Sequence, residues 1–400
     1  MIRLQDIQAA AVRIAGAVVR TPTTRSEVLS KRLGFELFLK HDHLQATGSF
    51  KERGARNALM LLPDEAKKQG VIAASAGNHA LALARHGQLL GISVTVVMPD
   101  FAPLTKVMKC SALGARVIQH GHTFDDARGH ATELSQTQGL TYVHGFDDAN
   151  VIAGAGTVAL EMMQDVANLD AIVVPVGGGG LLAGVAVAVR GLLPQMKLIG
   201  VETEYAPTMH ASLAAGRLVT IAARPTLADG LAIARAGQRC FDIVKDQVDQ
   251  VVLVDETHIA RAVLDLLEIE RTLVEGAGAA AFAGVTQHDL GLKGKRVGVV
   301  LCGSNIDLSI LGRLIDRGLA ASGRLCRLKC AISDRPGGLA RLTSLIAQTG
   351  ASIREVAHDR NFESPDIASV VVDLVLETRQ ASHIEMLRRT LEASGVRVLN

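Results

Sequence analysis

The sequence predicts an α/β protein with mostly parallel sheets, followed by a small module of strands and helices at the C-terminal end. Short aliphatic runs alternate with helical patterns from about Glu36 to about Leu301, which is typical of parallel sheets. Clusters of glycine lie where expected strands end and helices begin. After Arg317 the regular alternation of single strands and helices stops. Ligands of such sheets bind at the carboxyl ends of strands and against helix N-termini, so the glycines mark the expected site.

The first part of the chain, residues 1–317, is expected to form one large domain. Its expected strands are Glu36–Lys40, Val71–Ser75, Ser93–Met98, Arg116–Gln119, Ala171–Val176, Lys197–Glu202 and Arg296–Cys302. The helices expected between them are Lys51–Leu61, His79–Leu89, Asp125–Gln136, Gly156–Val166, Leu181–Leu192 and Ile259–Leu273.

The C-terminal part has a different order of elements. Residues 318–324 are small and polar and read as a linker, and residues 325–400 follow as a second domain. The elements expected there are a strand at Cys326–Ser333, a helix at Leu339–Thr349, strands at Ser352–Asp359 and Ala368–Glu377, a helix at Ala381–Ser394 and a strand at Val396–Leu399. This βαββαβ order describes a ferredoxin-like domain.

Composition excludes several classes of function. Hydrophobic residues make up 48% of the 400 residues and aromatic residues 3%, and the net charge is +2, so neither nucleic acid nor a membrane surface is an expected partner. The five cysteines form no CxxC pair, which argues against a zinc site or a disulfide framework and for a reducing compartment. No run of about 18 apolar residues occurs, and we expect a soluble, cytoplasmic protein.

Lys51 stands in the segment GSFKERGA at residues 48–55, where a helix is expected to open. The positive end of the helix dipole and desolvation both disfavour a charged amine, which suits a nucleophile or Schiff-base lysine. The alternative is that Ser49 caps the helix and Lys51 is solvated.

Two further segments lie between a strand and a helix. In SAGNHA at 75–80, small residues allow backbone N–H groups to converge on a carboxylate, although an ordinary capped turn is the alternative, with His79 packed in the interior. GGGGL at 177–181 offers a phosphate cradle; it is neither GxGxxG nor followed by GK[ST], and a flexible turn is its alternative.

Two single residues also end expected strands. Cys302, in CGSN at 302–305, places a thiol at the carboxyl edge of the sheet, where it is either part of a site or a small buried hydrophobe. Glu202 is either a cation ligand or a solvated or capping carboxylate.

Taken together, GSFKERGA, SAGNHA, GGGGL and CGSN resemble, in order and spacing, the fold-type II pyridoxal-phosphate (PLP) enzymes, and most closely the threonine/serine dehydratases (threonine ammonia-lyases). The resemblance covers roughly residues 1–317 and implies a tryptophan synthase β-like fold of two open-sheet lobes, the smaller at about 45–150. Residues 325–400 resemble an ACT domain, of which the turn DRPGGL at 334–339 is typical.

The resemblance implies a role for individual residues. Lys51 would bind PLP covalently, Phe50 would pack on its ring and Asn78 would bond its phenolic oxygen. The phosphate loop would be Gly177, Gly178, Gly179, Gly180 and Leu181, and Cys302 would lie beside the pyridine nitrogen. The substrate carboxylate would meet Ser75, Ala76, Gly77, Asn78 and His79. A monovalent or divalent cation would bind at Glu202, Ala206 and Thr208, as in relatives.

The implied reaction is PLP-dependent dehydration and deamination of L-threonine, and of L-serine, to 2-oxobutanoate or pyruvate and ammonia. An ACT domain implies a homo-oligomer, a dimer or tetramer, and an amino-acid effector at Asp334, Pro336, Gly337 and Gly338, with isoleucine biosynthesis as the pathway. Departures from the family pattern, such as Leu81 and Ala155 in place of glutamine, leave the substrate open.

Three alternatives stay open. A serine racemase or hydroxyaspartate dehydratase has the same fold, although Ala76 stands where racemase-like relatives commonly have serine. A non-catalytic ACT-type amino-acid sensor would not need Lys51. A dinucleotide-dependent oxidoreductase would need a GxGxxG motif, which Gly177–Gly180 do not form.

Overall fold

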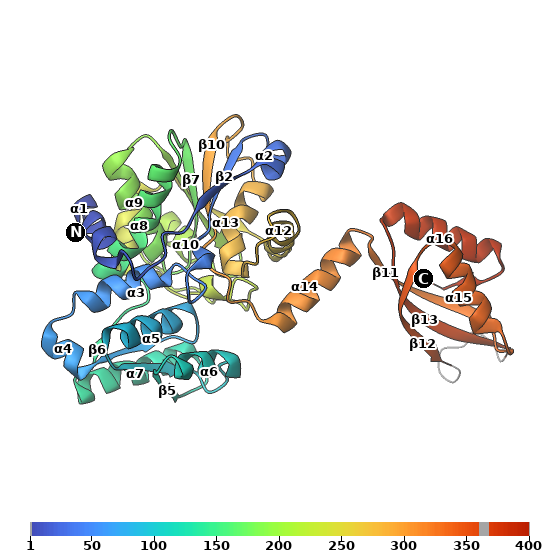
Figure 1. Cartoon of the computed structure of the whole chain (residues 1–400), viewed down its shortest axis with the longest axis horizontal. Coiled ribbons are helices and arrows are strands. Elements are labelled where there is room, and N and C mark those ends of the chain that lie inside the picture. Colours follow the sequence, from blue (N-terminus) through green and yellow to red (C-terminus); the bar gives the residue numbers. More distant parts are fainter. Residues whose placement is uncertain (1, 360–367, 400) are drawn as a thin grey trace. The chain divides into compact units, whose positions relative to one another are not determined.

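The computed structural model describes residues 2–359 and 368–399, and the chain divides into two compact units. The first unit comprises Met1–Ile306 and the second Asp307–Asn400. Each unit is described by itself below, and Figure 1 shows the elements of both.

The larger sheet of the first unit is mixed, with five strands in parallel and one antiparallel edge strand. The order of its strands is β1 (Thr23–Ser26), β2 (Glu36–Lys40), β10 (Arg296–Val300), β7 (Ala171–Pro175), β8 (Lys197–Thr203) and β9 (Gln250–Val254). The central strands are mainly small and aliphatic, with a charged residue at the start of β8 and of β10, and almost all of their residues are buried, as expected of a parallel sheet covered on both faces.

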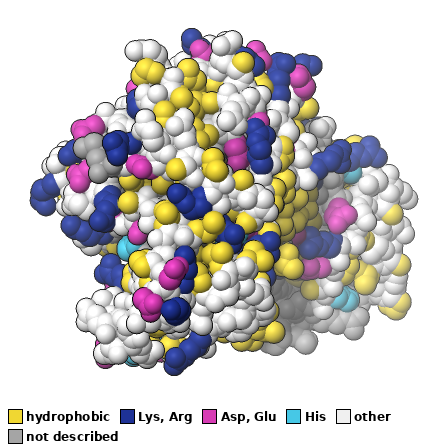
Figure 2. Space-filling model, turned by 60° about the vertical axis from the view of Figure 1, so that its left-hand side comes forward, with side chains coloured by type: hydrophobic (Ala, Val, Ile, Leu, Met, Phe, Trp, Pro, Cys, Tyr) yellow, Lys and Arg dark blue, Asp and Glu magenta, His cyan; other side chains and the backbone are white. Residues whose placement is uncertain are grey.

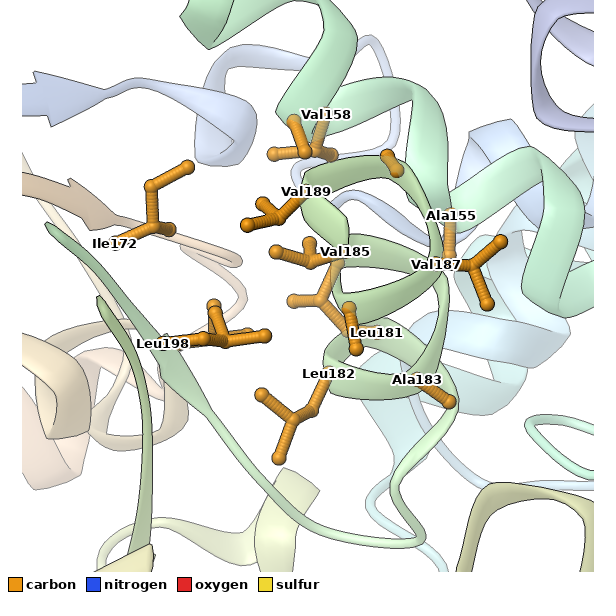
Figure 3. Close-up of a cluster of buried hydrophobic side chains, with 14 of the residues drawn as sticks. Ala155, Val158, Ile172, Leu181, Leu182, Ala183, Val185, Val187, Val189 and Leu198 are labelled. Atoms are coloured by element: carbon orange, nitrogen blue, oxygen red, sulfur yellow. The ribbon is translucent and has the colours of Figure 1, made fainter. Parts of the chain in front are cut away.

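Helices cover both faces of this sheet. A Cβ atom at Gly200 of β8 would contact Leu182 of α9 (Gly180–Leu192), whereas the next residue, Val201, contacts Gly284 of α13 (Gly276–Gln287). Because successive residues of a strand point to opposite faces, α9 and α13 lie on opposite sides of the sheet. Figure 3 shows the side chains of α9 between α8 (Ala149–Asp165) and strands β7 and β8.

The smaller sheet is entirely parallel and belongs to the same unit. Its order is β5 (Arg116–Gln119), β4 (Val94–Met98), β3 (Val71–Ala74) and β6 (Thr141–Tyr142). On β3, Val71 and Ala73 face α3 (Lys51–Met60) and α5 (Asn78–Leu90), while Ile72 and Ala74 face α7 (Phe124–Gln138). This alternation buries both faces of a short strand.

The other helices of the first unit complete the covering of the two sheets. They are α1 (Leu4–Ile14), α2 (Glu27–Leu33), α4 (Asp64–Gln69), α6 (Leu104–Ala112), α10 (Thr208–Ala215), α11 (Gln238–Gln247) and α12 (Glu256–Ile269), with short 3-10 turns η1 (Asp42–Leu44) and η2 (Asp229–Leu231).

The second unit has the predicted βαββαβ order after an initial helix, α14 (Leu308–Ala321). Its antiparallel sheet has the order β12 (Ser352–Asp359), β13 (Ser369–Glu377), β11 (Leu325–Ser333) and β14 (Arg397–Val398). The even-numbered residues of β11 pack with α15 (Gly338–Gln348) and α16 (Ala381–Ala393) in one core.

The structure differs from the sequence-based expectation at several boundaries. Residues 318–321, expected in a linker, continue α14, so the second unit begins at Asp307 rather than near 325. Helix α8 begins at Ala149, seven residues before the expected start, because Asp148 accepts hydrogen bonds from the N–H groups of Asn150 and Val151. The strands expected in the first unit were all found, but β1, β6 and β9 were not predicted.

The net charge of the chain is +2. On the face in Figure 2, Lys and Arg side chains are interspersed with Asp, Glu and hydrophobic side chains. No helix of the described residues has the length and apolar character that crossing a membrane requires.

Candidate active site

Lys51 is the first residue of α3, and its amine lies against the loop before α8. Nζ donates a 2.6 Å hydrogen bond to the carbonyl oxygen of Gly145 and lies 5.1 Å from the ring centroid of Phe50. Burial lowers the pKa of Lys51 to about 8, against the opposing influence of nearby acidic groups, of which Cys302 is the largest. An amine with such a pKa serves as a nucleophile and base near neutral pH.

The loop before Lys51 is held against the end of β10. Phe50 N donates to the carbonyl oxygen of Cys302 at 3.0 Å, and Ser49 forms an antiparallel bridge with Gly303. The N-cap residue of α3 is Phe50, which makes no side-chain cap, and the Ser49 hydroxyl is buried. The alternative of a capping Ser49 and a solvated Lys51 is therefore wrong.

The four glycines after β7 form a crowded loop in which added side chains would collide. A Cβ atom would lie 2.4 Å from the Phe146 ring at Gly178, 2.9 Å from the Phe146 carbonyl oxygen at Gly180 and 3.0 Å from Leu231 Cα at Gly177. Gly179 has a φ of +97°. Packing on both sides is inconsistent with a freely flexible turn.

Helix α9 starts in this loop, and no side chain caps its N-terminus. Such a terminus presents backbone N–H groups to an anion, and the absence of Cβ atoms allows close approach. Leu181 lies in the first turn of α9, and its side chain is buried in the hydrophobic core.

The segment Ser75–His79 leads from β3 into α5. Gly77 is the N-cap and makes no side-chain cap, and its N–H donates to Ser75 Oγ at 3.2 Å. Asn78, the first helical residue, donates to Glu275 Oε1 at 2.6 Å and accepts from Asn305 Nδ2 at 2.8 Å. The turn thus aims its amide side chain toward the end of β10.

His79 contacts the backbone of the segment that follows β6. Its Nε2 atom lies 3.0 Å from the carbonyl oxygen of Val143, and burial lowers the pKa of the ring to about 3. His79 is therefore a neutral, packed histidine at neutral pH. This agrees with the prediction that it is packed in the interior.

Cys302 lies at the carboxyl end of β10 and is buried. Its Sγ atom donates to the carbonyl oxygen of Ala277 at 3.5 Å. Burial, together with the charge of Glu275, raises the pKa of the thiol well above its usual range, so the thiol is neutral at physiological pH. Cys302 belongs to the hydrophobic core, and its charge state also influences Lys51.

Glu202 caps helix α10 and lies behind the glycine loop. Its two oxygens accept hydrogen bonds from Met209 N at 2.7 Å and His210 N at 2.8 Å, and Met209 contacts the position of a Cβ atom at Gly179. Burial raises the pKa of Glu202 to about 8.

The neighbours of Glu202 are bonded to the backbone. The Ala206 carbonyl oxygen accepts from Thr208 N at 2.9 Å, and Thr208 Oγ1 donates to the Ile233 carbonyl oxygen. Among the residues that the structure describes, no three or more His, Cys, Asp or Glu side chains are grouped to hold a metal ion.

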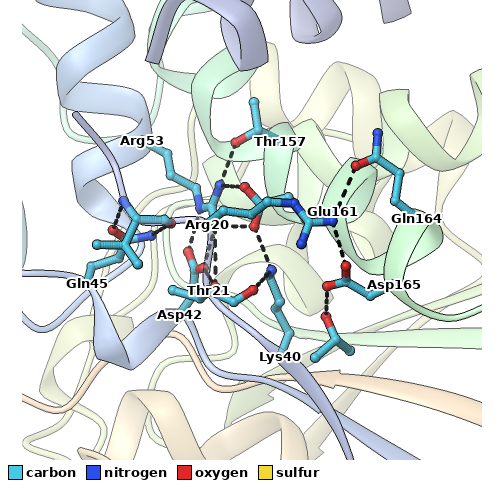
Figure 4. A network of polar contacts seen from close by, with 12 residues as sticks. Arg20, Thr21, Lys40, Asp42, Gln45, Arg53, Thr157, Glu161, Gln164 and Asp165 are labelled. Atoms are coloured by element: carbon cyan, nitrogen blue, oxygen red, sulfur yellow. Dashed lines mark hydrogen bonds and ion pairs between the residues drawn. The ribbon is translucent and has the colours of Figure 1, made fainter. Parts of the chain in front are cut away.

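A buried network of charges supports α3 two residues after Lys51. Arg53, with a side chain that is 0% exposed, donates to both oxygens of Asp42 and of Glu161, and Lys40 donates to Glu161 at 2.6 Å (Figure 4). Two cations face two carboxylates, so each buried charge has a partner. The network ties the helix that carries Lys51 to η1 and to α8.

The second unit contains a separate cavity of about 320 Å³ at the start of α15. Gly337, the N-cap, has a φ of +90° and makes no side-chain cap, and a Cβ atom at Gly338 would lie 2.5 Å from the Ser333 carbonyl oxygen. The lining residues are Ile332, Ser333, Asp334, Arg335, Pro336, Gly337, Leu339, Ala340 and His358. The cavity offers polar groups and N–H donors to a small ligand.

Three residues of the first site were not found from the sequence. Glu275 and Asn305 bond Asn78, and Gly145 accepts from Lys51. Asn305 belongs to the segment CGSN, but its role depends on contacts across the chain. Glu275 could have been noticed in the sequence because it stands directly before a helix of small residues, α13.

Comparison with known proteins gives consistent results for the first unit. The model of the family described as pyridoxal-phosphate dependent enzyme matches residues 14–303. A protein of Thermotoga maritima named L-threonine ammonia-lyase is 44% identical over 398 residues, which cover 100% of this chain and 99% of the relative. Its match thus extends through both units.

Two solved structures are also similar. The processed form of threonine deaminase isoform 2 from Solanum lycopersicum has a TM-score of 0.75 and 38% identity, covering 78% of this chain and 86% of that chain. Serine racemase from Dictyostelium discoideum has a TM-score of 0.72 and 34% identity, covering 76% of this chain and 99% of that chain.

Proposed function

The chain belongs to the family of pyridoxal-phosphate dependent enzymes. Within this family we propose that it is an L-threonine ammonia-lyase, which converts L-threonine to 2-oxobutanoate and ammonia. The observation that carries the proposal is the 44% identity along the full chain to a protein of that name. It is supported by the Lys51 amine of lowered pKa, which bonds Gly145, the residue before the Phe146 that packs on the glycine loop. L-Serine, which gives pyruvate, is the second proposed substrate.

The residues at the site fit PLP. The uncapped start of α9 at Gly177–Gly180 suits a phosphate, because N–H groups are available and any side chain would collide. Lys51 supplies an amine of lowered pKa, Phe50 an adjacent ring, Asn78 an amide and Cys302 a neutral thiol. These are the residues that we propose hold the cofactor.

PLP, when bound, supplies a conjugated electron sink for the substrate amino acid. We assign to Lys51 the removal of the substrate Cα proton, for which a pKa of about 8 is well matched to neutral conditions. Backbone N–H groups of Ala76–Asn78 would hold the substrate carboxylate. The Ser75 N–H, also expected there, instead donates to the Val97 carbonyl oxygen at 3.1 Å, because Ser75 continues the pairing of β3 with β4. Cys302, the residue proposed beside the ring nitrogen, is a neutral thiol and not a carboxylate, which favours loss of a β-hydroxyl over transamination.

Racemisation is the nearest alternative, because serine racemases share the fold. That reaction needs a second acid or base on the opposite face of the substrate. Ala76 carries no such group, and this disfavours a racemase. A hydroxyaspartate dehydratase of the same fold is the other alternative. An activity assay with hydroxyaspartate as substrate distinguishes it from a threonine ammonia-lyase.

The test of the proposed function is an absorbance spectrum of the purified protein before and after addition of L-threonine. We expect a visible PLP band that changes with substrate, and equimolar formation of 2-oxobutanoate and ammonia. A colourless protein, or formation of D-threonine or D-serine faster than a 2-oxo acid, would contradict the proposal.

A cation near the glycine loop is a further part of the proposal. The Glu202 carboxylate is buried with a raised pKa, and a bound monovalent or divalent cation would stabilise its ionised form. The remaining ligands would be the carbonyl oxygen of Ala206 and the hydroxyl of Thr208. Activity that is unchanged after dialysis against chelator and across sodium and potassium salts would contradict it.

For the second unit we propose an ACT regulatory domain. Its βαββαβ order and the cavity lined by Asp334, Pro336 and Gly337 support binding of an amino-acid effector. Gly338, also expected at the effector site, is the first residue of α15 and does not line the cavity. We further propose a homo-oligomer, a dimer or tetramer, paired through ACT domains, and a role in isoleucine biosynthesis in the cytoplasm. An amino-acid sensor without catalysis would explain this unit but gives no reason for the Lys51 site.

A further inference from the structure

Glu275 is a buried carboxylic acid at the centre of the candidate site to which the proposed mechanism gives no role. It is the N-cap residue of α13, yet its side chain does not cap that helix. The residue is only 4% exposed, and Oε1 accepts the 2.6 Å hydrogen bond from Asn78 Nδ2. A Cβ atom at Gly303 would lie 2.1 Å from Oε1, so only glycine at that position permits this approach.

The hydrogen bonds around Asn78 determine which way its amide points. Asn305 Nδ2 donates to the carbonyl oxygen of Thr47 at 2.7 Å, and a backbone carbonyl only accepts. The same Nδ2 donates to Asn78 Oδ1 at 2.8 Å. Asn78 Oδ1 is therefore the acceptor, and Asn78 Nδ2 has one hydrogen directed to Glu275 and a second hydrogen for another partner.

Charged and titratable groups from several elements surround Glu275. Asp229 of η2 disfavours its ionised form, whereas the Asn78 amide of α5, Lys106 of α6 and the backbone of Asn305 favour it. The charge of Glu275 in turn raises the pKa of Lys51 of α3 and of Cys302, which follows β10. Burial is the largest influence and raises the pKa of Glu275 to about 7, so both protonation states occur near neutral pH.

We propose that Glu275 is a positioning residue of the cofactor site, which holds the Asn78 amide so that its second Nδ2 hydrogen is presented to the phenolic oxygen of PLP. The inference rests on the proposed function, because it requires that PLP bind at this site. Asn305 orients the amide from the other side, and Gly303 leaves room for the carboxyl group. A change of protonation at Glu275 then alters the environment of Asn78 and Lys51 together.

The test compares Glu275→Ala and Glu275→Gln with the native chain and with Asp265→Asn. Asp265 is a matched control, since it is also buried but bonds Arg32 and Arg261 instead of site residues. The first measurement is the dissociation constant of PLP for each cofactor-free protein. We expect about a tenfold weaker binding for Glu275→Ala, as for loss of one strong hydrogen bond, and unchanged binding for the control.

The second measurement is the visible absorbance of bound PLP between pH 6 and pH 8.5. For the native chain we expect this absorbance to change near pH 7, where Glu275 titrates. Glu275→Gln keeps an acceptor for Asn78 but does not titrate, so we expect PLP affinity within about threefold of native and loss of that change. Asn305→Ala, which frees the amide, should weaken PLP binding as Glu275→Ala does, and it replaces that variant if Glu275→Ala does not fold.

The outcomes separate the two proposals. If the native chain binds no PLP, the proposed function itself fails. If the native chain binds PLP but the Glu275 and Asn305 variants match Asp265→Asn in affinity and in spectral titration, Glu275 has no positioning role.

Discussion

The Lys51 amine donates its 2.6 Å hydrogen bond to a backbone carbonyl, that of Gly145, and not to a carboxylate. A carboxylate partner would stabilise the ammonium form, as Asp42 and Glu161 do at Lys40, where they oppose the effect of burial on the pKa. Burial is the largest influence at both residues: it lowers the pKa of Lys40 despite the two carboxylates, and it lowers the pKa of Lys51, whose acceptor is neutral, to about 8. Lys40 and Lys51 therefore differ in their partners: the Lys40 amine bonds the Glu161 carboxylate, and the Lys51 amine bonds a backbone carbonyl.

The first prediction is that PLP is attached to Lys51. Borohydride reduction of the protein with PLP, followed by peptide mapping, should place the pyridoxyl group on Lys51, whose amine has a lowered pKa. Lys40 is the internal control, since its side chain is completely buried but paired with Glu161. A label on Lys40 or on any other lysine would overturn the assignment, and Lys51→Ala should lose both the label and turnover.

The second prediction concerns Cys302. Cys302→Ser keeps a small neutral group and should retain substantial activity. Cys302→Asp places a charge in a buried position and favours protonation of the ring nitrogen, so we expect a loss of at least about 100-fold in kcat, or a misfolded protein. Steady-state kinetics with L-threonine tests both variants, and a Cys302→Asp enzyme as active as the native one would reduce Cys302 to core packing.

The third prediction is that Gly178→Ala damages the site. The added methyl group would lie 2.4 Å from the Phe146 ring, so we expect a loss of roughly 1–3 kcal/mol in unfolding free energy and weaker PLP binding. Gly129→Ala is the control, because nothing lies within 4 Å of that position on helix α7, and it should stabilise the protein by roughly 0.5–1 kcal/mol. Equal behaviour of the two variants would show that Phe146 moves aside freely.

The local order of apolar and polar residues was sufficient to predict the strands and helices around the glycine loop. Each strand there is a short aliphatic run that is followed by glycine or other small or polar residues. Strand β1 (Thr23–Ser26) was missed, since its polar sequence and antiparallel pairing with β2 give no aliphatic signal. Strand β6 contains two residues and is recognisable only by its pairing with β3.

The site was predicted where chemistry is local in the sequence, as at Lys51 and Gly177–Gly180. Glu275 was not, because its contact with Asn78 joins residues 197 positions apart. The same holds for the pairing of Arg53 with Glu161, which local pattern leaves undetermined. Long-range polar contacts depend on how the sheets pack. The spacing of apolar residues in a single sequence predicts helices and strands, but it does not predict which distant residues come together.

The fourth prediction is a pH dependence of stability that comes from Glu275. Its folded-state pKa of about 7 lies above the ordinary value of 4.5, so the folded protein binds the extra proton between these values. Glu275 therefore contributes a loss of stability as pH rises from about 4.5 to about 7, and Glu275→Gln lacks this contribution. As pH rises over this range, the unfolding free energy of Glu275→Gln should increase relative to that of the native chain by up to about 3 kcal/mol.

Denaturant unfolding of the cofactor-free proteins at pH 5 and pH 7.5 measures this difference. Asp249→Asn is the control, because hydrogen bonds from Leu198 and Arg190 hold the pKa of Asp249 below its usual value and thus below this range. The difference between Asp249→Asn and the native chain should stay constant over the range. A constant difference for Glu275→Gln as well would mean that Glu275 stays ionised in the folded protein.

The last prediction is that the cavity at the start of α15 binds a branched-chain amino acid and thereby changes the kinetics of the enzyme. Exposed N–H groups at the uncapped helix suit an amino-acid carboxylate, and Ile332 and Leu339 offer an apolar wall to its side chain. Regulation requires that the ligand bind one conformational state better than another, so both binding and a change in KM or kcat are expected.

The experiment is titration of isoleucine and valine into the full chain by calorimetry and by activity with L-threonine. Gly337→Ala strains the turn, because φ is +90° there, and should weaken effector binding by about tenfold. Gly395→Ala is the matched control, with φ of +81°, no neighbour within 4 Å and a position outside the cavity, and it should bind like the native chain. Identical kinetics and no heat of binding with either amino acid would leave the second unit a role in subunit pairing alone.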